Sequence, residues 1–539
     1  MNNSDTSIYI NGRIFTADNQ NPYADSMIVS GGRIRWVGSR DDLPREEISG
    51  ADVVDLKGRR VIPGFVDAHM HPVMLADFSK QITIMPPAVN SIEDLVKAVR
   101  ERRKAQGPGR WVEGWGYDEQ SLLEKRSPNR YDLDRGCSDA PVCLMRTCAH
   151  IRCVNSRALE MAGIDRNTPD PPGGEIERDE NGEPTGVLKE NARNLMSGLI
   201  PGVPEDQKVQ NLLDLGKLLT SQGITAICDM GNLDSGDNIP IYEKAAEKGF
   251  RQRVGVYYMW DFFADDKTFD IPKERMDKSR QIFAAGLKLI GDGSISGRTA
   301  WMDEPYYGSD DEYGISTCSD ELIESAIAFC KDHHCQLSMH AMGSRTIARM
   351  VDRAALEENW MEDETPYVRI EHVTEPKAES LDRAAASGIA FITQPIFPYA
   401  ESASYLKNLG SERLKKCYPF RHMLEKGVKT GFSTDAPATF WAVPSDPFPG
   451  LKLAVTRKSY LDADCGADQS IDIETALKLY TRESAQIAGF HDMGMLSPGY
   501  RADFAVLSGD ILEADPEDID KICVLRTYID GECVYRRED

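Results

Sequence analysis

The chain of 539 residues is long enough for more than one domain and for a large hydrophobic core. Its hydrophobic fraction of 41% and charged fraction of 28% are typical of a globular protein, and its net charge of −24 disfavours a nucleic-acid partner, because phosphates attract Lys and Arg. Because there is no secretory leader, no apolar run that could cross a bilayer and no Cys-x-x-Cys pair among the 12 cysteines, we expect a cytoplasmic protein with reduced thiols and no membrane partner.

The first 60 residues contain short apolar runs separated by turn signals. Residues 7–15 have Asn-Gly between two such runs, and residues 26–38 repeat the pattern with Gly-Gly. A third short strand is expected at residues 52–58. These segments predict a small β module.

The stretch from Val61 to Pro72 begins as an apolar, β-branched run, which predicts a buried strand, and it ends in His69-Met70-His71. Side chains two residues apart on a strand share one face, so His69 and His71 should project together from its C-terminal end. Two imidazoles on one rigid support can begin a zinc site. Two ordinary surface histidines would show the same pattern.

Residues 73–215 have strands and helices of their own and therefore predict an inserted α/β subdomain, at about residues 80–215. A Pro- and Gly-rich run at residues 169–174 and Asn181-Gly182 mark loops. The expected elements are helices at residues 91–104 and 156–163 and a strand at residues 141–146.

From about residue 216, apolar strands alternate with helical patterns such as residues 320–332 and 344–358. This alternation predicts βαβ units and a parallel sheet. Together with the strand that ends at His71 there are eight strands, which suggests a TIM barrel, although a doubly wound sheet shows the same alternation. The other seven are residues 223–229, 253–260, 286–291, 335–340, 367–372, 388–393 and 428–435.

Residues that can bind a metal stand at the C-terminal ends of four of these eight strands. A barrel brings such ends together at one mouth, where its active site lies. One histidine of this kind would usually be a core residue, but four strand ends together indicate a metal site. Lys288, within the fourth strand, is a basic group in an apolar run and must be paired, neutralised or modified if it is buried. The strand-end residues are His69 with His71, His340, His372 and Asp435.

These residues resemble the motifs of the amidohydrolase superfamily, and the resemblance covers nearly the whole chain. It lies in residues 63–71, 338–340, 371–372 and 433–437. Within the superfamily the chain is most similar to the YtcJ-like branch, which includes N-substituted formamide deformylases. The branch motifs are residues 114–118, 182–186, 286–294 and 297–300.

The resemblance implies an α/β fold with a (β/α)8 TIM-like barrel, a small β-sandwich formed by both chain ends, and an α/β insertion after the first barrel strand. We expect the sandwich at residues 1–60 and 485–539. The barrel then occupies residues 61–484 and includes the insertion.

It also implies one or two divalent metal ions. In the family pattern His69 and His71 hold the more buried ion, and His340 and His372 hold the second. Asp435 would bind the first ion and carry protons. Lys288 would be carboxylated on its amine and bridge both ions. Zinc suits these ligands best, and manganese, iron, nickel and cobalt remain open.

The implied activity is hydrolysis of a carbon–nitrogen bond in a small amide, formamide or cyclic amide by a metal-activated water, with Asp435 passing a proton to the leaving amine. A deaminase acting on a ring carbon–nitrogen bond is the nearest alternative. A non-catalytic interaction protein is disfavoured by the complete ligand set. The sequence does not identify the small-molecule substrate, since loops shape the pocket, and it leaves a homodimer open.

Five further residues are candidates for binding substrate. Each has a plain structural alternative: a structural histidine, a turn aspartate between two glycines, or aromatic core. The five are His150, Asp292, Trp115, Tyr117 and Trp301.

Glu190 is a candidate for an alternative metal carboxylate, although residues 187–190 also resemble the start of a helix. We assign no role to His422. His333 and His334 precede a strand and are expected in solvent.

Overall fold

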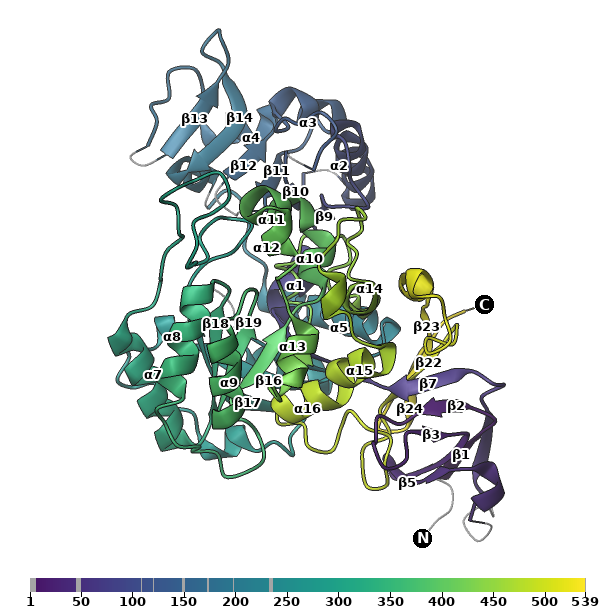
Figure 1. Cartoon of the computed structure of the whole chain (residues 1–539). Helices are drawn as coiled ribbons and strands as arrows, with labels where there is room; N and C mark the ends of the chain where they lie inside the picture. Colours follow the sequence, from purple (N-terminus) through teal and green to yellow (C-terminus); the bar gives the residue numbers. More distant parts are fainter. Residues whose placement is uncertain are drawn as a thin grey trace. The chain divides into compact units, whose positions relative to one another are not determined.

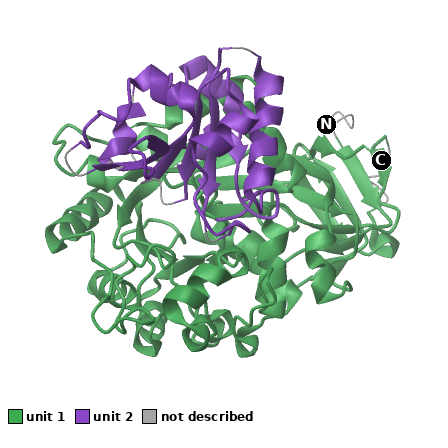
Figure 2. Cartoon of the chain, turned by 90° about the horizontal axis from the view of Figure 1, so that it is seen from above, with its two compact units in different colours: residues 1–73, 212–439, 445–539 green, residues 74–211, 440–444 purple. Residues whose placement is uncertain are grey.

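A computed structural model describes residues 6–44, 50–107, 109–119, 121–147, 151–171, 174–196, 198–231 and 236–538. The chain forms two compact units, coloured separately in Figure 2. Unit 1 comprises residues 1–73, 212–439 and 445–539, and unit 2 comprises residues 74–211 and 440–444.

Unit 1 contains a parallel sheet of eight strands in the order β8, β15, β16, β17, β18, β19, β20, β21. Beyond β21 the Asp435 amide donates to the His69 carbonyl at 2.7 Å, and the His71 amide donates to the Ala436 carbonyl at 2.8 Å, which nearly closes the sheet. The expected TIM-like barrel is therefore confirmed, and the doubly wound sheet is excluded. The strands are β8 (Phe65–Met70), β15 (Ile224–Asp229), β16 (Arg253–Met259), β17 (Ile282–Ile290), β18 (Gln336–Ala341), β19 (Val368–His372), β20 (Ala390–Thr393) and β21 (Thr430–Phe432).

Helices α7 (Asp320–His333), α8 (Ser344–Ala354) and α9 (Ala378–Ser387) cover the outer side of β17, β18 and β19 (Figure 1). Helix α7 begins where the Ser319 side chain accepts a hydrogen bond from the Leu322 amide, and it ends at His334 in a left-handed conformation. The predicted helix at residues 320–332 is confirmed. Helix α8 ends four residues before the expected limit. Other helices of unit 1 are α6 (Ile239–Glu247), α10 (Ile396–Ala400), α11 (Ser402–Leu409), α12 (Ser411–Leu414), α13 (Phe420–Glu425), α14 (Pro447–Thr456), α15 (Ile473–Lys478) and α16 (Ser484–Ile487). Helices α1 (Pro72–Phe78) and α5 (Glu205–Ser221) include residues of both units.

Two further sheets of unit 1 form the expected β-rich domain from both ends of the chain. One has the order β5, β4, β1, β6, and the other has the order β24, β23, β22, β7, β2, β3. They share a core that includes Tyr9, Phe504 and Tyr528, with the last two rings stacked at 4.3 Å. The strands are β1 (Thr6–Ile10), β2 (Arg13–Phe15), β3 (Tyr23–Ala24), β4 (Ser26–Ser30), β5 (Arg33–Gly38), β6 (Asp52–Asp55), β7 (Arg60–Pro63), β22 (Phe504–Leu507), β23 (Val524–Ile529) and β24 (Glu532–Arg536).

The stretch from Val61 to Pro72 is two strands rather than the single strand expected. Strand β7 pairs with β2 and β22, and β8 pairs with β15 in the barrel. Gly64 separates them, and a Cβ atom there would lie 2.3 Å from the Thr225 hydroxyl oxygen. Only glycine therefore fits where the chain passes from one sheet to the other.

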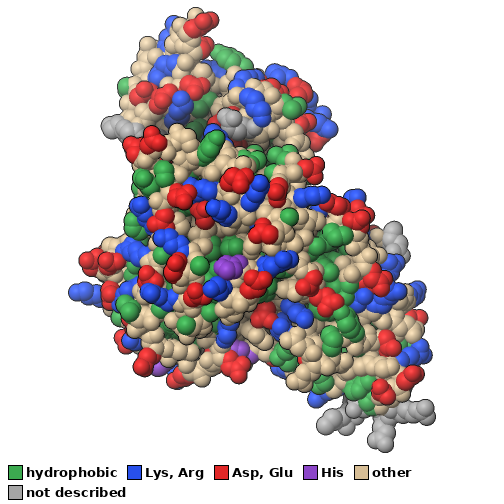
Figure 3. Space-filling model, in the orientation of Figure 1, with side chains coloured by type: hydrophobic (Ala, Val, Ile, Leu, Met, Phe, Trp, Pro, Cys, Tyr) green, Lys and Arg blue, Asp and Glu red, His purple; other side chains and the backbone are tan. Residues whose placement is uncertain are grey.

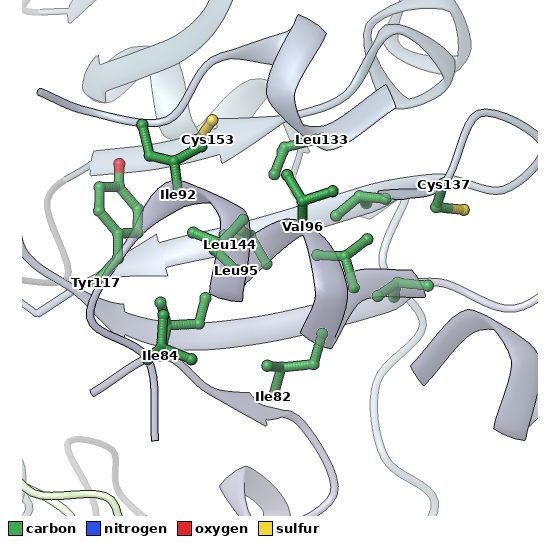
Figure 4. Close-up of a cluster of buried hydrophobic side chains, with 14 of the residues drawn as sticks. Ile82, Ile84, Ile92, Leu95, Val96, Tyr117, Leu133, Cys137, Leu144 and Cys153 are labelled. Atoms are coloured by element: carbon green, nitrogen blue, oxygen red, sulfur yellow. The ribbon is translucent and has the colours of Figure 1, made fainter. Parts of the chain in front are cut away.

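Unit 2 is built on a six-stranded sheet in the order β13, β14, β12, β11, β10, β9. Side chains of α2 pack with Ile82, Ile84 and Leu144 in its hydrophobic core (Figure 4). The expected helices at residues 91–104 and 156–163 are present as α2 and α4, but residues 187–190 end a strand and do not begin a helix. The elements are α2 (Ile92–Gln106), α3 (Arg130–Gly136), α4 (Ser156–Ala162), β9 (Ile82–Thr83), β10 (Val112–Tyr117), β11 (Val142–Arg146), β12 (Ile151–Val154), β13 (Gly174–Arg178) and β14 (Pro184–Glu190).

Acidic and basic side chains are interspersed over the face in Figure 3. In the part of the chain that the structure describes, no helix combines the length and apolar character that a bilayer requires, and every cysteine is a free thiol.

Candidate metal centre

The strand-end residues of unit 1 meet at the mouth of the barrel. His69 lies in β8 and His71 one residue beyond it, His340 lies in β18, His372 ends β19, and Asp435 follows β21 by three residues. The ligand atoms of His69, His71 and Asp435 all lie within 4.8 Å of one another. The Nε2 atom of each of these two histidines is 3.3 Å from Oδ1 of Asp435.

Hydrogen bonds on the far side of the rings fix the protons of both histidines. Nδ1 of His69 lies 2.6 Å from Oε2 of Glu371, and Nδ1 of His71 lies 2.6 Å from the Gly231 carbonyl. A carboxylate and a carbonyl only accept, so the network assigns the proton of each neutral ring to Nδ1 and the lone pair to Nε2.

Three lone-pair atoms therefore face one another at this point. Oδ1 of Asp435 is buried and receives no hydrogen bond from the described residues, although two imidazole nitrogens are near it. An unpaired buried acceptor is costly, and three together repel. A divalent cation would satisfy all three, and the set of two imidazoles and one carboxylate is one that zinc and similar metals accept.

The charges of the group also fit a cation. Burial acts to raise the pKa of Asp435, but His69, His71 and His372 outweigh it, and the pKa lies well below its usual value. Burial lowers the pKa of His69. For His71 burial acts in the same direction, but the neighbouring Asp435 carboxylate outweighs it and raises the pKa. Asp435 is therefore an anion at neutral pH.

His340 and His372 form a second pair beside the first. Their ring centroids are 4.4 Å apart, and that of His372 is 4.9 Å from that of His69. Nδ1 of His372 is 2.9 Å from Oε1 of Gln394, and Nε2 of His340 is 3.0 Å from the Gly293 carbonyl. These bonds leave Nε2 of His372 and Nδ1 of His340 as acceptors. Burial lowers the pKa of His372 well below its usual value, so the ring is neutral.

Lys288 is buried in β17, with its Nζ atom 3.5 Å from Nε2 of His69. Burial lowers its pKa to about 8, although Glu371 and Asp435 act in the opposite sense. Among the described residues no carboxylate forms an ion pair with it. Asp292, the partner considered from the sequence, has its oxygens bonded to backbone amides instead.

Two candidate ligands have strained backbones. His372 has φ 74°, the β-branched Val373 after it has φ 52°, and Asp435 has φ 59°. Such left-handed conformations cost about 1–3 kcal/mol at non-glycine residues and gather at functional sites. The Val373 amide donates to the carbonyls of Ala341 and Glu371, which helps hold the turn in place.

Asp292 and Trp301 lie near the second histidine pair. Asp292 is buried and accepts hydrogen bonds from the amides of Met342, Gly343 and Trp301 at 2.8–3.0 Å. It also lies 3.3 Å from Nε2 of His340. It thus ties the loop after β17 to the end of β18, which is more than the turn role considered from the sequence. The Trp301 ring lies against the Arg345 guanidinium at 5.7 Å.

The other predicted pocket residues belong to unit 2. Trp115 packs against Phe78 at 4.8 Å, and Tyr117 is buried in the core of that unit. His150 lies outside the described residues. Glu190 is the last residue of β14.

Of the remaining histidines, His422 lies on α13 and is half-buried, at 3.9 Å from Glu425. His333 is half-buried with Nε2 2.8 Å from Asp270, and His334 is exposed. None of these three contacts the candidate ligands.

Two residues that touch the candidate ligands have no role in the sequence interpretation. Glu371 contacts His69 and Gln394 contacts His372. Gln394 directly follows β20. A search for polar residues at strand ends would therefore have identified it if side-chain amides had been included.

Comparisons with known proteins identify the family of the chain. The profile described as Amidohydrolase family matches residues 52–535. YtcJ of Bacillus subtilis is 31% identical over 98% of this chain and 99% of its own length. N-substituted formamide deformylase of Arthrobacter pascens is 27% identical over 98% of each chain. The crystal structure of an uncharacterized metal-dependent hydrolase from Pyrococcus furiosus is 27% identical, has a TM-score of 0.72, and covers 94% of this chain and 100% of that chain.

Proposed function

Because the chain belongs to the amidohydrolase family, we propose that it hydrolyses a carbon–nitrogen bond of a small amide, formamide or cyclic amide at a metal centre in the barrel mouth. The observation that carries the proposal is the cluster of ligand atoms on His69, His71 and Asp435, which lie within 4.8 Å of one another while Oδ1 of Asp435 receives no hydrogen bond from the described residues. The similarity to a formamide deformylase supports the substrate class.

We assign His69, His71 and Asp435 to one ion and His340 and His372 to a second. Zinc suits the ligands best, while manganese, iron, nickel and cobalt accept similar donors. When bound, such an ion supplies Lewis acidity and lowers the pKa of a bound water.

Asp435 is the proton carrier in this proposal. Its carboxylate stays ionised at neutral pH, so it can accept the proton of the attacking water. The low pKa also means that it holds that proton weakly and gives it up to the departing amine. His340 and His372, whose ring centroids are 4.4 Å apart, would hold the second ion, which would polarise the carbonyl group of the substrate.

Lys288 is proposed to carry a carboxyl group on Nζ. Its pKa of about 8 leaves a useful share of neutral amine, the form that attacks carbon dioxide. The new N–C bond forms as the nitrogen loses one proton, which gives a carbamate anion. Two nearby cations would stabilise that anion. Support comes from the absence of an ion-pair partner among the described residues, since Arg369 occupies Glu371.

The test begins with elemental analysis of protein purified without chelator. We expect about one to two transition-metal ions per chain, as in one- and two-ion hydrolase sites. The protein is then screened against N-formyl, N-acyl and cyclic amides, with ammonia release from ring amines as the assay for the deaminase alternative. Chelation should abolish turnover and added metal should restore it. Less than about a tenth of an ion, without rescue by added metal, would contradict the proposal.

A further inference from the structure

A buried carboxylate lies directly behind the imidazole of His69. Glu371, in β19, is fully buried, and its Oε2 atom is 2.6 Å from Nδ1 of His69. This bond joins β19 to β8 on the side of the ring opposite Asp435. It determines which nitrogen of His69 faces the metal centre, because a carboxylate can only accept.

The carboxylate itself is held by three more hydrogen bonds. Arg369 donates from Nε to Oε1 at 2.5 Å and from Nη2 to Oε2 at 3.0 Å. The Ser338 hydroxyl donates to Oε1 at 2.7 Å. With His69, four donors meet two oxygens, so neither oxygen can rotate toward another partner.

Arg369 is anchored in turn to two other strands. Its Nη2 atom donates to the Ala68 carbonyl of β8 at 2.5 Å, and Nη1 donates to the Tyr257 hydroxyl of β16 at 3.2 Å. The Tyr257 ring lies 5.3 Å from the guanidinium carbon. The chain of contacts therefore runs through the barrel wall and ends at a candidate ligand.

We propose that Glu371 is a positioning residue for the metal centre: held by Arg369 and Ser338, it keeps the His69 proton on Nδ1 and so keeps Nε2 available as a ligand. The inference rests on the metal centre proposed above, but it concerns residues to which no role has been given. A carboxylate behind a ligating histidine also raises the basicity of the ring, and losing such a partner typically weakens metal binding about 10–100-fold.

The alternative is an ion pair that only stabilises the barrel. A buried pair is weak evidence for stability, because the desolvation cost of two charges can exceed their attraction. If the Arg369–Glu371 pair acted only in folding, it would not need the additional hydrogen bond to His69. The two roles differ in one readout, the position of the proton on His69.

Glu371→Gln separates the two roles. Arg369 donates to both oxygens of the wild-type carboxylate. Whichever way the substituted amide is turned, its NH₂ group therefore lies against an N–H group of Arg369. In one orientation it also faces Nδ1 of His69 and drives the imidazole proton to Nε2. We expect a folded protein whose zinc dissociation constant, measured by competition with a chromophoric chelator, rises about 10–100-fold.

Asp510→Asn is the matched control. Asp510 accepts from Nε and Nη2 of Arg60 at 2.7 and 2.8 Å, a bidentate pair of the β-rich domain that touches no candidate ligand. This variant should lower the melting temperature and leave the zinc dissociation constant unchanged.

The second measurement uses wild-type protein, in which Glu371 is unchanged. In metal-free wild-type protein with ¹⁵N-labelled histidine, the His69 signal, assigned with His69→Asn, should report a proton on Nδ1. A proton on Nε2, or wild-type zinc affinity in Glu371→Gln, would overturn the inference. If Glu371→Gln does not fold, the spectrum of the wild type decides. If wild-type protein binds no zinc, the proposed metal centre fails, whereas the spectrum still tests the position of the proton.

Discussion

In the proposed mechanism Asp435 has two roles, as a metal ligand and as a proton carrier. Asp435→Asn keeps the size of the side chain but removes the charge and the basic oxygen. We expect the variant to fold and to lose hydrolysis by about 10²-fold or more, within the range of general acid–base groups. The measurement is kcat on a substrate found by the screen, with circular dichroism to confirm folding.

Asp503→Asn is the control for that loss, because Asp503 is also buried but lies beside β22 in the β-rich domain. It should keep near-wild-type kcat. If Asp435→Asn were as active as this control, Asp435 would have no part in proton transfer.

Lys288 gives a prediction with a pH dependence. Only neutral amine reacts with carbon dioxide, and the pKa of about 8 means that its fraction grows as pH rises through 8. At constant dissolved carbon dioxide, the rate at which bicarbonate plus metal reactivates metal-free protein should therefore rise with pH below 8 and level off above it. Metal alone should reactivate less.

Lys288→Ala should lose one of two ions, and short carboxylic acids should restore part of the activity. A crystal structure of metal-replete protein with a bare amine at Lys288 would refute the carbamate and leave a hydrolase with a single ion.

The convergence of the candidate ligands His69, His71, His340, His372 and Asp435 at the barrel mouth could be predicted from the sequence, because each stands at or just beyond the end of an apolar strand. His340 and His372 needed only strand positions and the barrel rule. The role of Glu371 could not be found in the same way, because it depends on a contact with a residue 302 positions away. For Tyr117 the sequence suggested a role that the structure does not support. Its motif suggested a place in the pocket wall, whereas its side chain lies in the hydrophobic core of unit 2.

At the scale of elements, the passage between β7 and β8 is the step that joins the β-rich domain to the barrel. The apolar, β-branched composition of residues 61–70 predicts an extended chain but gives no sign that the chain passes from one sheet to another. Gly64 was the only local signal, and its meaning depends on Thr225, which approaches from β15.

Gly64→Ala should therefore destabilise unit 1. Its Cβ would meet the Thr225 side chain at 2.3 Å, and overpacking of this kind costs about 1–3 kcal/mol. Urea unfolding measures the loss. Adding Thr225→Ala should restore part of the stability by removing the two closest atoms.

Gly202→Ala is the matched control, because a Cβ there meets nothing within 4 Å. It should change stability by less than about 0.5 kcal/mol, as surface substitutions usually do. Equal effects of the two glycine substitutions would show that backbone freedom, and not the contact with Thr225, matters at Gly64.

At the scale of the whole molecule, the alternation after residue 216 predicted a parallel sheet of βαβ units, because parallel strands need helical crossovers that leave a regular pattern. The count of eight strands suggested a barrel, and the family resemblance implied it. The limits proposed from the sequence are residues 1–60 with 485–539, residues 61–484, and the insertion at about residues 80–215. The pairing of both chain ends in one domain came from the family resemblance, and the insertion from the strands and helices expected within it. Which strands of the two chain ends pair was not predictable, because strands as distant as β7 and β22 pair through backbone groups that every sequence shares.

The division into two units leads to the last prediction. The candidate ligands all belong to unit 1, whereas unit 2 has its own sheet and hydrophobic core. A ligand that binds only the folded state stabilises it by RT ln(1 + [L]/Kd), about 2.7 kcal/mol at a hundredfold excess over Kd. Since the entropy of unfolding is about 2.1 cal/mol/K per residue, this stabilisation should raise the melting temperature of unit 1, which has roughly 400 residues, by about 3 °C. Scanning calorimetry of metal-free protein, with and without zinc, measures this shift, and far-UV circular dichroism confirms that both samples start folded.

The transition of unit 2 should not move, and Asp435→Asn should show a smaller shift than wild type because one ligand is missing. An unchanged thermogram at saturating zinc, or an equal shift in Asp435→Asn, would mean that the ion does not bind at this carboxylate.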